Sequence, residues 1–408
     1  MTISEDALHK IVAWEDRKLA DDVSLISGQH VMARDVNTRG EGVAYLTGPA
    51  DFPHGTINQT KFTTRPTKMC QAGDILLTVK GSGAGSLVRA DQQYCISRQL
   101  MAIRPRNWDA RFLYYSLQQN SASIKEASAG LIPGLSRSDI LDQLLPIPSA
   151  SEEQRSIAAA LQDSDDLIAT IERLIAKKQA IKQGMMQQLL TGRSRLPGFG
   201  SRWAPVRLGD AGGTFGGLTG KSKDDFGNGS AVFVTFMEVM AGARLRGKRL
   251  ERVNVGPAER QNRVLKGDVL FNGSSETPEE LALAAVVDYN PSPRTYLNSF
   301  CFGYRLKRDD QIDPTYLAHF FRSSQGRDLV SVLAQGATRY NIAKTKLLQV
   351  APILPPIEEQ RAVVSVLSDV EAEMSVLDAR LSKARAIKTG MMQQLLTGRT
   401  RLPVEAAS

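Results

Sequence analysis

Residues 182–197 read KQGMMQQLLTGRSRLP and residues 388–403 read KTGMMQQLLTGRTRLP, so one stretch is spelled twice, 206 residues apart. The similarity extends back without a gap to the tetrapeptide EEQR, which occupies residues 152–155 and again residues 358–361. A repeat of this length and spacing indicates one structural unit that is used twice.

Both copies carry apolar residues at alternating steps of four and three, the spacing of a coiled-coil seam. Ser164 and Lys178 interrupt the seam of the first copy. The seam residues are Ile157, Leu161, Ile168, Ile171 and Ile175 in the first copy, and Val363, Leu367, Val370, Met374, Leu377 and Leu381 in the second. Ser151 and Gln154 have the spacing of a capping box, and Gly192 and Gly398 stand where a left-handed residue ends a helix. We therefore predict two helices of nearly forty residues, each roughly 55 to 60 Å long at 1.5 Å per residue.

The charges along each helix are divided by sign. Residues 152–172 hold six acids and one base, whereas residues 173–195 hold six bases and no acid, and the second copy repeats this division. The helix dipole alone explains part of the pattern, because it favours acids at the start and bases at the end. In an antiparallel pair, however, each acidic half would also face a basic half. We therefore predict an antiparallel coiled coil within one chain, with two arms at opposite ends of a rigid rod and related by a pseudo-twofold axis.

Each helix contains an internal glycine that is followed by two methionines. Glycine in a helix costs about 1 kcal/mol relative to alanine, which suggests close approach of another backbone. Two explanations stand equally: packing inside the chain itself, or docking of a partner subunit, which adaptable methionines also suit. The residues concerned are Gly184, Met185, Met186, Gly390, Met391 and Met392.

Composition indicates the class of partner. The chain has 408 residues and a net charge of +8, which favours a polyanionic partner. Residues 198–357 hold 21 Lys and Arg against 15 Asp and Glu, so most of this excess lies in the second arm. The three widely spaced cysteines predict neither a disulfide framework nor a zinc site. Neither a membrane-spanning run nor a signal peptide is found in the sequence, so we expect a cytoplasmic protein.

The segments before the two helices resemble each other in outline. Near its start, each segment has a Trp, then a basic residue followed by Leu, and then an Asp. Each also contains a related predicted strand, AGDILL at 72–77 and KGDVLF at 266–271. An amphipathic helix and a proline-rich hinge follow in both. Each arm is thus predicted to be a mixed α/β globule. The predicted domains are a first arm at 1–148, a first spacer helix at 149–197, a second arm at 198–354, a second spacer helix at 355–403 and a tail at 404–408.

Catalytic motifs are missing from the sequence. The segment TVKGSGAGS at 78–86 has glycines typical of a cofactor loop, but the residues after it are typical of strands rather than of the helix that such a loop requires. The four histidines, His9, His30, His54 and His319, do not cluster, and an NPPY-like tetrapeptide is not found. We therefore predict no catalytic, cofactor-binding or metal-binding residues and no enzymatic activity for this chain.

Together, the doubled EEQR and LLTGR(S/T)RLP segments and the two related arms resemble the specificity subunit of type I restriction-modification systems, which serve in phage defence. The resemblance implies that each arm is a target recognition domain that binds one half of a bipartite, asymmetric DNA sequence. It also implies that the helices set the spacing and dock two copies of a DNA adenine methyltransferase subunit. S-adenosylmethionine, ATP and Mg would then be bound by partner subunits, which include a restriction translocase and nuclease.

Polar and basic residues in glycine-containing loops are the best candidates for DNA contacts. The candidates are Arg39, Lys61, Arg65, Lys68, Lys80, Ser82 and Arg137 in the first arm, and Lys221, Lys223, Arg244, Arg246, Lys248, Asn272, Ser274, Arg339 and Asn341 in the second. Two other interpretations stay open on the sequence alone: a coiled-coil scaffold that does not contact DNA, and a self-contained DNA methyltransferase.

Overall fold

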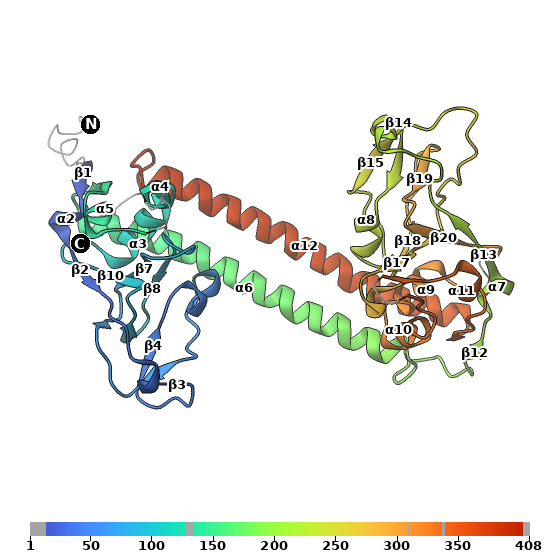
Figure 1. Ribbon diagram of the computed structural model, residues 1–408, viewed down its shortest axis with the longest axis horizontal. Coiled ribbons are helices and arrows are strands. Elements are labelled where there is room, and N and C mark those ends of the chain that lie inside the picture. The colour runs from blue at the N-terminus through green and yellow to red at the C-terminus, as the bar shows by residue number, and fades with distance from the viewer. Residues whose placement is uncertain (1–13, 128–133, 309, 337–338, 403–408) are drawn as a thin grey trace, which may run out of the picture. The chain divides into compact units, whose positions relative to one another are not determined.

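The computed structural model describes residues 14–127, 134–308, 310–336 and 339–402 (Figure 1). The chain forms two compact units: unit 1 comprises residues 1–172 and 379–408, and unit 2 comprises residues 173–378. The two long helices, α6 (Ser151–Leu189) and α12 (Ile357–Leu395), each have 39 residues. Each unit therefore contains one arm and one half of each long helix.

The arm of unit 1 is built on an antiparallel four-stranded sheet. Its strands lie in the order β2 (Val23–Ser27), β10 (Leu100–Pro105), β7 (Ile75–Thr78), β8 (Leu87–Arg89). A second sheet has the order β3 (Val36–Asn37), β5 (Phe62–Thr63), β4 (Val43–Leu46), β9 (Tyr94–Ile96), β6 (Met69–Cys70). β1 (Trp14–Lys18) pairs with β11 (Leu144–Pro148), and the helices are α2 (Leu19–Asp22), α3 (Ala110–Gln119), α4 (Ser121–Ala127) and α5 (Arg137–Leu141).

The arm of unit 2 is built on an equivalent antiparallel four-stranded sheet. Its four-stranded sheet has the order β13 (Gly212–Gly216), β20 (Cys301–Leu306), β16 (Val269–Asn272), β18 (Ala284–Val286). β14 (Phe226–Val234) lies between β15 (Leu250–Val253) and β19 (Thr295–Leu297), β12 (Ala204–Pro205) pairs with β22 (Ile353–Leu354), and β17 (Ser274–Ser275) pairs with β21 (Tyr340–Asn341). The helices are α7 (Leu208–Ala211), α8 (Phe236–Met240), α9 (Pro314–Phe320), α10 (Ser324–Ser331) and α11 (Lys344–Leu347).

The Gly-Asp dipeptides that the two arms share start an inner strand of each sheet. All four residues of β7 and of β16 are buried, as expected for short apolar runs covered on both faces. The buried Asp74 accepts from Arg104 Nε at 2.8 Å and from Nη2 at 2.7 Å. The buried Asp268 accepts from Arg305 Nε and Nη2, both at 2.7 Å. Each aspartate thus ties the start of its strand to the neighbouring strand.

Residues of both long helices belong to the hydrophobic core of each arm. In unit 1, Ile157 and Leu161 of α6 pack in one cluster with Leu395 of α12, Leu396 and the apolar face of α3. In unit 2, Val363 and Leu367 of α12 pack in the equivalent cluster with Leu189 of α6 and Leu190. The other predicted seam residues are buried (Ile171, Ile175) or half-buried (Ile168, Val370, Met374, Leu377, Leu381). The helix halves are therefore part of the core of each unit.

Within each unit the two half-helices run antiparallel beside one another (Figure 1). In unit 1, Lys388 lies 2.6 Å from Asp165, and Arg385 lies 2.6 Å from Glu172. In unit 2, Lys182 lies 2.6 Å from Glu371, and Lys178 pairs with Glu373. The bases of one helix therefore meet the acids of the other in both units, as the division of charge predicts.

The EEQR segment of each copy is bonded to the arginine of the RLP segment of the other copy. The second glutamate, Glu153, is 1% exposed, and its carboxylate accepts hydrogen bonds from Arg401 Nε and, at 2.7 Å, from Nη2. Glu359, also 1% exposed, accepts from Arg195 Nε at 2.8 Å and from Nη2. We call these two bidentate pairs the cross-locks, because each joins the start of one long helix to the residues that follow the other.

Glycine ends both long helices, as predicted. Gly192 and Gly398 have φ angles of +70° and +69°, the left-handed conformation that glycine adopts without strain. A Cβ atom on Gly398 would lie 2.9 Å from the Trp14 ring, and one on Gly192 would lie 3.2 Å from the Trp203 ring. The tryptophan near the start of each arm therefore packs on the glycine that ends a long helix in the same unit.

The prediction that Gln154 caps α6 is wrong. Its side chain accepts from Asp109 N at 2.9 Å and donates to Pro148 O at 3.0 Å. Gln360 does the same in unit 2, where it accepts from Asp313 N at 2.9 Å and donates to Pro355 O at 2.8 Å. Each glutamine thus joins the start of its long helix to the N-cap residue of an arm helix, α3 or α9.

Replacing Glu153 with alanine is expected to destabilise unit 1 by about 1 to 2 kcal/mol, because a charge-assisted pair with a buried acceptor is lost while the partner keeps some contact with water. The matched control is Glu152→Ala. The Glu152 side chain is 58% exposed and pairs along its own helix with Arg155, so its loss should change the free energy of unfolding by less than about 0.5 kcal/mol. Urea denaturation of both variants measures the difference, and equal effects would contradict a stabilising cross-lock.

Candidate nucleic-acid interface

Most of the predicted DNA contacts of the first arm lie outside its helices, Arg137 is the first residue of α5, and Arg39, Lys61 and Arg65 each lie near an acidic side chain. Arg39 Nη2 donates to Glu41 Oε2 at 3.0 Å, and Lys61 Nζ donates to Thr47 Oγ1 at 2.8 Å. Arg137 Nη1 donates to Leu25 O at 3.3 Å. The side chains of Arg65, Lys68, Lys80 and Ser82 are exposed. All seven remain available to solvent at least in part, so their positions are compatible with contacts to a phosphate backbone.

Three candidates of the second arm serve the fold instead. Asn272 is fully buried, where its Oδ1 accepts from Leu283 N at 2.6 Å and its Nδ2 donates to Glu280 O at 2.8 Å. The Lys221 side chain is 6% exposed and pairs with Glu259, and this hydrogen bond is the main cause that lowers the pKa of Glu259 to about 2. The third is Arg244, whose contacts are described below. We do not expect these three side chains to contact DNA.

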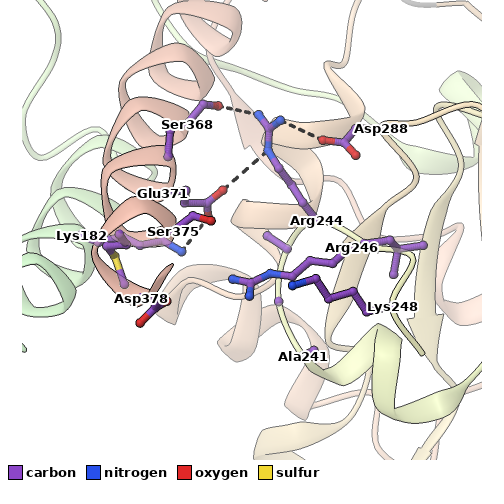
Figure 2. A pocket seen from close by; sticks show the side chains of 15 residues that line it. Lys182, Ala241, Arg244, Arg246, Lys248, Asp288, Ser368, Glu371, Ser375 and Asp378 are labelled. Atoms are coloured by element: carbon purple, nitrogen blue, oxygen red, sulfur yellow. Dashed lines mark hydrogen bonds and ion pairs between the residues drawn. The ribbon is translucent and has the colours of Figure 1, made fainter. Parts of the chain in front are cut away.

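The loop at 241–249 carries the densest group of basic residues in the second arm. Arg244 Nη1 donates to Asp288 Oδ2 at 2.9 Å, and its Nη2 donates to Ser368 Oγ of α12. Figure 2 shows Arg244 turned toward α12, whereas Arg246 and Lys248 extend into an open pocket of about 490 Å³ between the loop and α12. Arg246 and Lys248 are exposed, and so is Arg249. The loop is therefore anchored through one arginine and presents three other cations.

A buried carboxylate that the sequence did not reveal shapes this loop. Glu238 of α8 is 3% exposed, and its side chain accepts from the backbone N–H groups of Arg246 at 2.8 Å, Lys248 at 3.4 Å and Arg249 at 3.2 Å. The three basic side chains are thereby held on one ordered turn of backbone. The sequence carries no signal for this role, because an isolated glutamate eight residues before a basic segment is common on solvated surfaces.

The structure brings three further candidates together beside β17 and β21. Ser274 pairs with Asn341 across the two strands, and the Arg339 guanidinium lies over the Phe300 ring, 5.4 Å from its centroid. Phe300 is 56% exposed. Ser274, Phe300 and Asn341 line an open pocket of about 270 Å³. Lys223 is exposed on a separate turn of the same arm.

The glycine and methionine residues that are candidates for docking a partner differ in their contacts within the chain. A Cβ atom on Gly184 or Gly390 would meet nothing within 4 Å, so neither glycine is required by packing inside the chain. The methionines are half-buried: Met185 and Met186 pack against the core of unit 2, and Met391 and Met392 against that of unit 1. Packing within the chain thus explains part of the role of the methionines and leaves the glycines without an internal contact.

Ionisable residues in the described part of the chain do not gather into a metal-binding group. Among the described residues, no group of three or more His, Cys, Asp or Glu could hold a metal ion. Cys70, Cys95 and Cys301 are buried free thiols, and burial raises the pKa of Cys301 to about 12, which disfavours its nucleophilic form. No described helix is long and apolar enough to cross a membrane.

Comparison with known proteins gives a consistent picture. The family model for the type I restriction modification DNA specificity domain matches residues 11–183 and 200–383. The type I restriction enzyme MjaVIII specificity subunit of Methanocaldococcus jannaschii is 24% identical over 411 residues, covering 95% of this chain and 93% of the relative. The putative MjaX specificity subunit of the same organism is 30% identical over 188 residues, and this match spans 45% of this chain and 44% of the relative.

Solved structures share the fold. The crystal structure of a type I restriction-modification S subunit from M. genitalium is similar with a TM-score of 0.60 and 16% identity, covering 95% of this chain and 97% of that chain. A structure from a study of the assembly of a type I restriction-modification system has a TM-score of 0.58 and 17% identity, covering 95% of this chain and 98% of that chain.

Proposed function

The chain belongs to the family of type I restriction-modification DNA specificity subunits, and on that premise we propose that each of its arms binds one half of a bipartite, asymmetric DNA sequence. The observation that carries the proposal is that the two arms share one frame and differ on their surfaces. Both have an equivalent four-stranded sheet order, with a buried aspartate bonded to an arginine of the neighbouring strand. Two arms with the same fold but different surfaces would bind two different half-site sequences.

We further propose that the loop at 241–249 contacts the phosphate backbone in the half-site of the second arm. Its exposed cations, Arg246, Lys248 and Arg249, are held by Glu238 and have the charge that phosphate contacts require. Such contacts would supply affinity without sequence information, so base reading must come from other residues of the arm.

The long helices are proposed to set the distance between the half-sites. In this proposal the recognition domains at 1–148 and 198–354 are separated by an antiparallel coiled coil of the spacer helices at 149–197 and 355–403, related by a pseudo-twofold axis. The antiparallel half-helices and the cross-lock of each unit support it. A coiled coil of fixed length would let the binding free energies of the two arms add. The centres of the two half-sites would then lie roughly one DNA turn of about 10 bp apart.

The helices are also proposed to dock two methyltransferase subunits, one for each copy of the repeat. Among the described residues, nothing lies within 4 Å of a Cβ atom built on Gly184 or Gly390, so the helix surface there would admit the backbone of a partner. The partners would hold S-adenosylmethionine, and a translocase and nuclease subunit would use ATP and Mg. We propose that this assembly works in the cytoplasm, on double-stranded DNA.

Deletion of the gene is expected to remove methylation from one bipartite, asymmetric adenine motif in the host genome, and expression of the chain with its partners should restore it. Long-read mapping of modified adenines measures this. A methylome that does not change on deletion would count against the proposal.

Two further assays separate the alternative functions. A gel-shift of the assembled complex without sequence preference would favour a scaffold that does not read DNA. Methyl transfer to DNA by the purified chain alone would instead identify it as a methyltransferase.

A further inference from the structure

Each arm has the same tight turn directly before an inner strand of its four-stranded sheet. In unit 1 the turn is 97–100, and Leu100 N donates to Ser97 O at 2.9 Å. In unit 2 the turn is 298–301, and Cys301 N donates to Asn298 O at 3.0 Å. The first side chain of each turn also accepts from the third backbone N–H: Gln99 N donates to Ser97 Oγ at 3.2 Å, and Phe300 N donates to Asn298 Oδ1 at 2.9 Å. We call these the reading turns.

Equivalent hydrogen bonds to neighbouring segments hold both reading turns. The bonds in unit 1 are Gln29 N to Ile96 O at 2.9 Å, Ser97 N to Leu46 O at 3.0 Å and Val79 N to Gln99 O at 2.8 Å. The bonds in unit 2 are Leu218 N to Leu297 O at 2.8 Å, Asn298 N to Val234 O at 3.0 Å and Gly273 N to Phe300 O at 2.8 Å. A Cβ atom on Gly28 would lie 2.0 Å from Ser97 O, and one on Gly217 would lie 2.0 Å from Asn298 O, so a glycine packs directly against each turn. The backbone of the turns is thus fixed in the same way in both arms.

The two residues at the tip of each turn are exposed and chemically unlike. They are Arg98 and Gln99 in the first arm and Ser299 and Phe300 in the second. Among the described residues, neither the Arg98 nor the Gln99 side chain has a hydrogen-bond partner. The turns also line open pockets, of about 380 Å³ in the first arm and about 270 Å³ in the second. A protein that recognises two different half-sites requires the same well-fixed backbone in both arms with different exposed side chains on it.

We infer that the reading turn of each arm contacts base edges and that its two tip residues help to specify the half-site, an inference that rests on the proposed function. Arginine forms bidentate hydrogen bonds to guanine O6 and N7, and glutamine forms them to adenine N6 and N7. Arg98 and Gln99 therefore suit a half-site with a G·C and an A·T pair beside the turn. Phe300 suits an apolar contact instead, to a thymine methyl group or against an opened base step.

Two neighbours of Phe300 support a contact to a base. Arg339 lies over its ring and would keep the ring in position. Ser274 Oγ lines the same pocket, is buried, and has no hydrogen-bond partner among the described residues. An exposed aromatic ring beside a polar group without a partner matches the stacking and hydrogen-bonding faces of a nucleobase.

The test measures which DNA sequences the complete complex, this chain with its methyltransferase partner, methylates in a library with randomised half-sites. Arg98→Ala or Gln99→Ala should lower the preference at one base pair of one half-site roughly ten- to a hundredfold and leave the other half-site unchanged. Phe300→Ala should do the same in the other half-site. The double change Arg98→Ser with Gln99→Phe should alter the bases accepted in the first half-site. The matched controls are Gln71→Ala and Leu265→Ala, two exposed residues away from the turns.

The outcomes are separable. A wild-type complex that shows no bipartite motif would refute the proposed function itself. A wild-type bipartite motif that every turn variant keeps would overturn the inference alone. An equal loss of methylation at all sequences, with the preferences kept, would mean phosphate contacts and would overturn it as well. If an alanine variant does not assemble by gel filtration, Arg98→Lys and Gln99→Glu, which keep the size of the side chains, decide between the same outcomes.

Discussion

Leu161→Ala is expected to lower the free energy of unfolding of unit 1 by about 2 to 5 kcal/mol, because it removes a fully buried side chain and leaves a cavity. Leu161 is 0% exposed and lies in the cluster that joins α6, the arm helix α3 and Leu395 of α12. Three elements therefore lose contacts in one substitution. Urea denaturation followed by circular dichroism measures the loss.

Leu167→Ala is the matched control for this prediction. Leu167 lies six residues further along the same helix and is 54% exposed. Alanine is a strong helix former, so this change should stay within about 0.5 kcal/mol of the wild type. Similar losses for the two variants would show that Leu161 is not a core residue.

Unit 2 is expected to lose stability as the pH falls from about 6.5 toward 4, because His319 is buried in its neutral form. The side chain is 0% exposed, and its pKa is lowered from 6.5 to about 4, mainly by burial, with the charge of Glu371 opposing this shift and the charges of Lys182, Arg244 and Arg322 adding to it. Since the unfolded chain binds the proton at higher pH than the folded one, stability is fully present above pH 6.5. Between pH 7.5 and 5 we expect a loss of about 2 kcal/mol.

The variant that isolates this effect is His319→Tyr, which introduces the residue found at the equivalent place in unit 1. There, Tyr115 OH donates to Asp165 Oδ2 at 2.8 Å, and Lys388 approaches the same carboxylate at 2.6 Å. In unit 2, Glu371 is the corresponding acid and Lys182 the corresponding base. The free energy of unfolding of the variant should vary less with pH over this window than that of the wild type. Parallel curves would place the titration elsewhere.

The long helices could be predicted because their signals are local. The apolar steps of four and three, the terminal glycines and the division of charge all depend on residues within a few turns of one another. The antiparallel pairing inside each unit follows from the same pattern of charges, which does not depend on the arms. Periodicity alone thus predicts both helices, without knowledge of any tertiary contact.

The cross-locks could not be predicted, because Glu153 and Arg401 are 248 residues apart in the sequence. In sequence, Glu152 and Glu153 are indistinguishable neighbours, and only the fold makes one exposed and the other buried. Asn272 illustrates the same limit among the candidate DNA contacts. A polar residue that follows an apolar run is typical of a surface loop, yet Asn272 is the buried last residue of β16 and bonds the segment that follows it. Burial of single polar side chains depends on neighbours that no local pattern specifies.

The reading turns could not be predicted from the sequence for a related reason. Arg98, Gln99 and Phe300 belong to no motif, and the two turns do not match in sequence at their tips. Their equivalence rests on backbone hydrogen bonds, which any residue can form. Their equivalence is visible in the backbone hydrogen bonds and not in the amino-acid sequence.

The composition of unit 1 has a consequence for the order of folding during synthesis. Its core includes Leu395 and Leu396, and its cross-lock includes Arg401, so the unit cannot close when its own arm leaves the ribosome. At roughly 5 to 20 residues per second, Glu153 waits about 10 to 50 s for a partner 248 residues away, while unit 2 is made in full. The segment translated first is therefore completed last, and until then Ile157 and Leu161 lack the apolar contacts of Leu395 and Leu396.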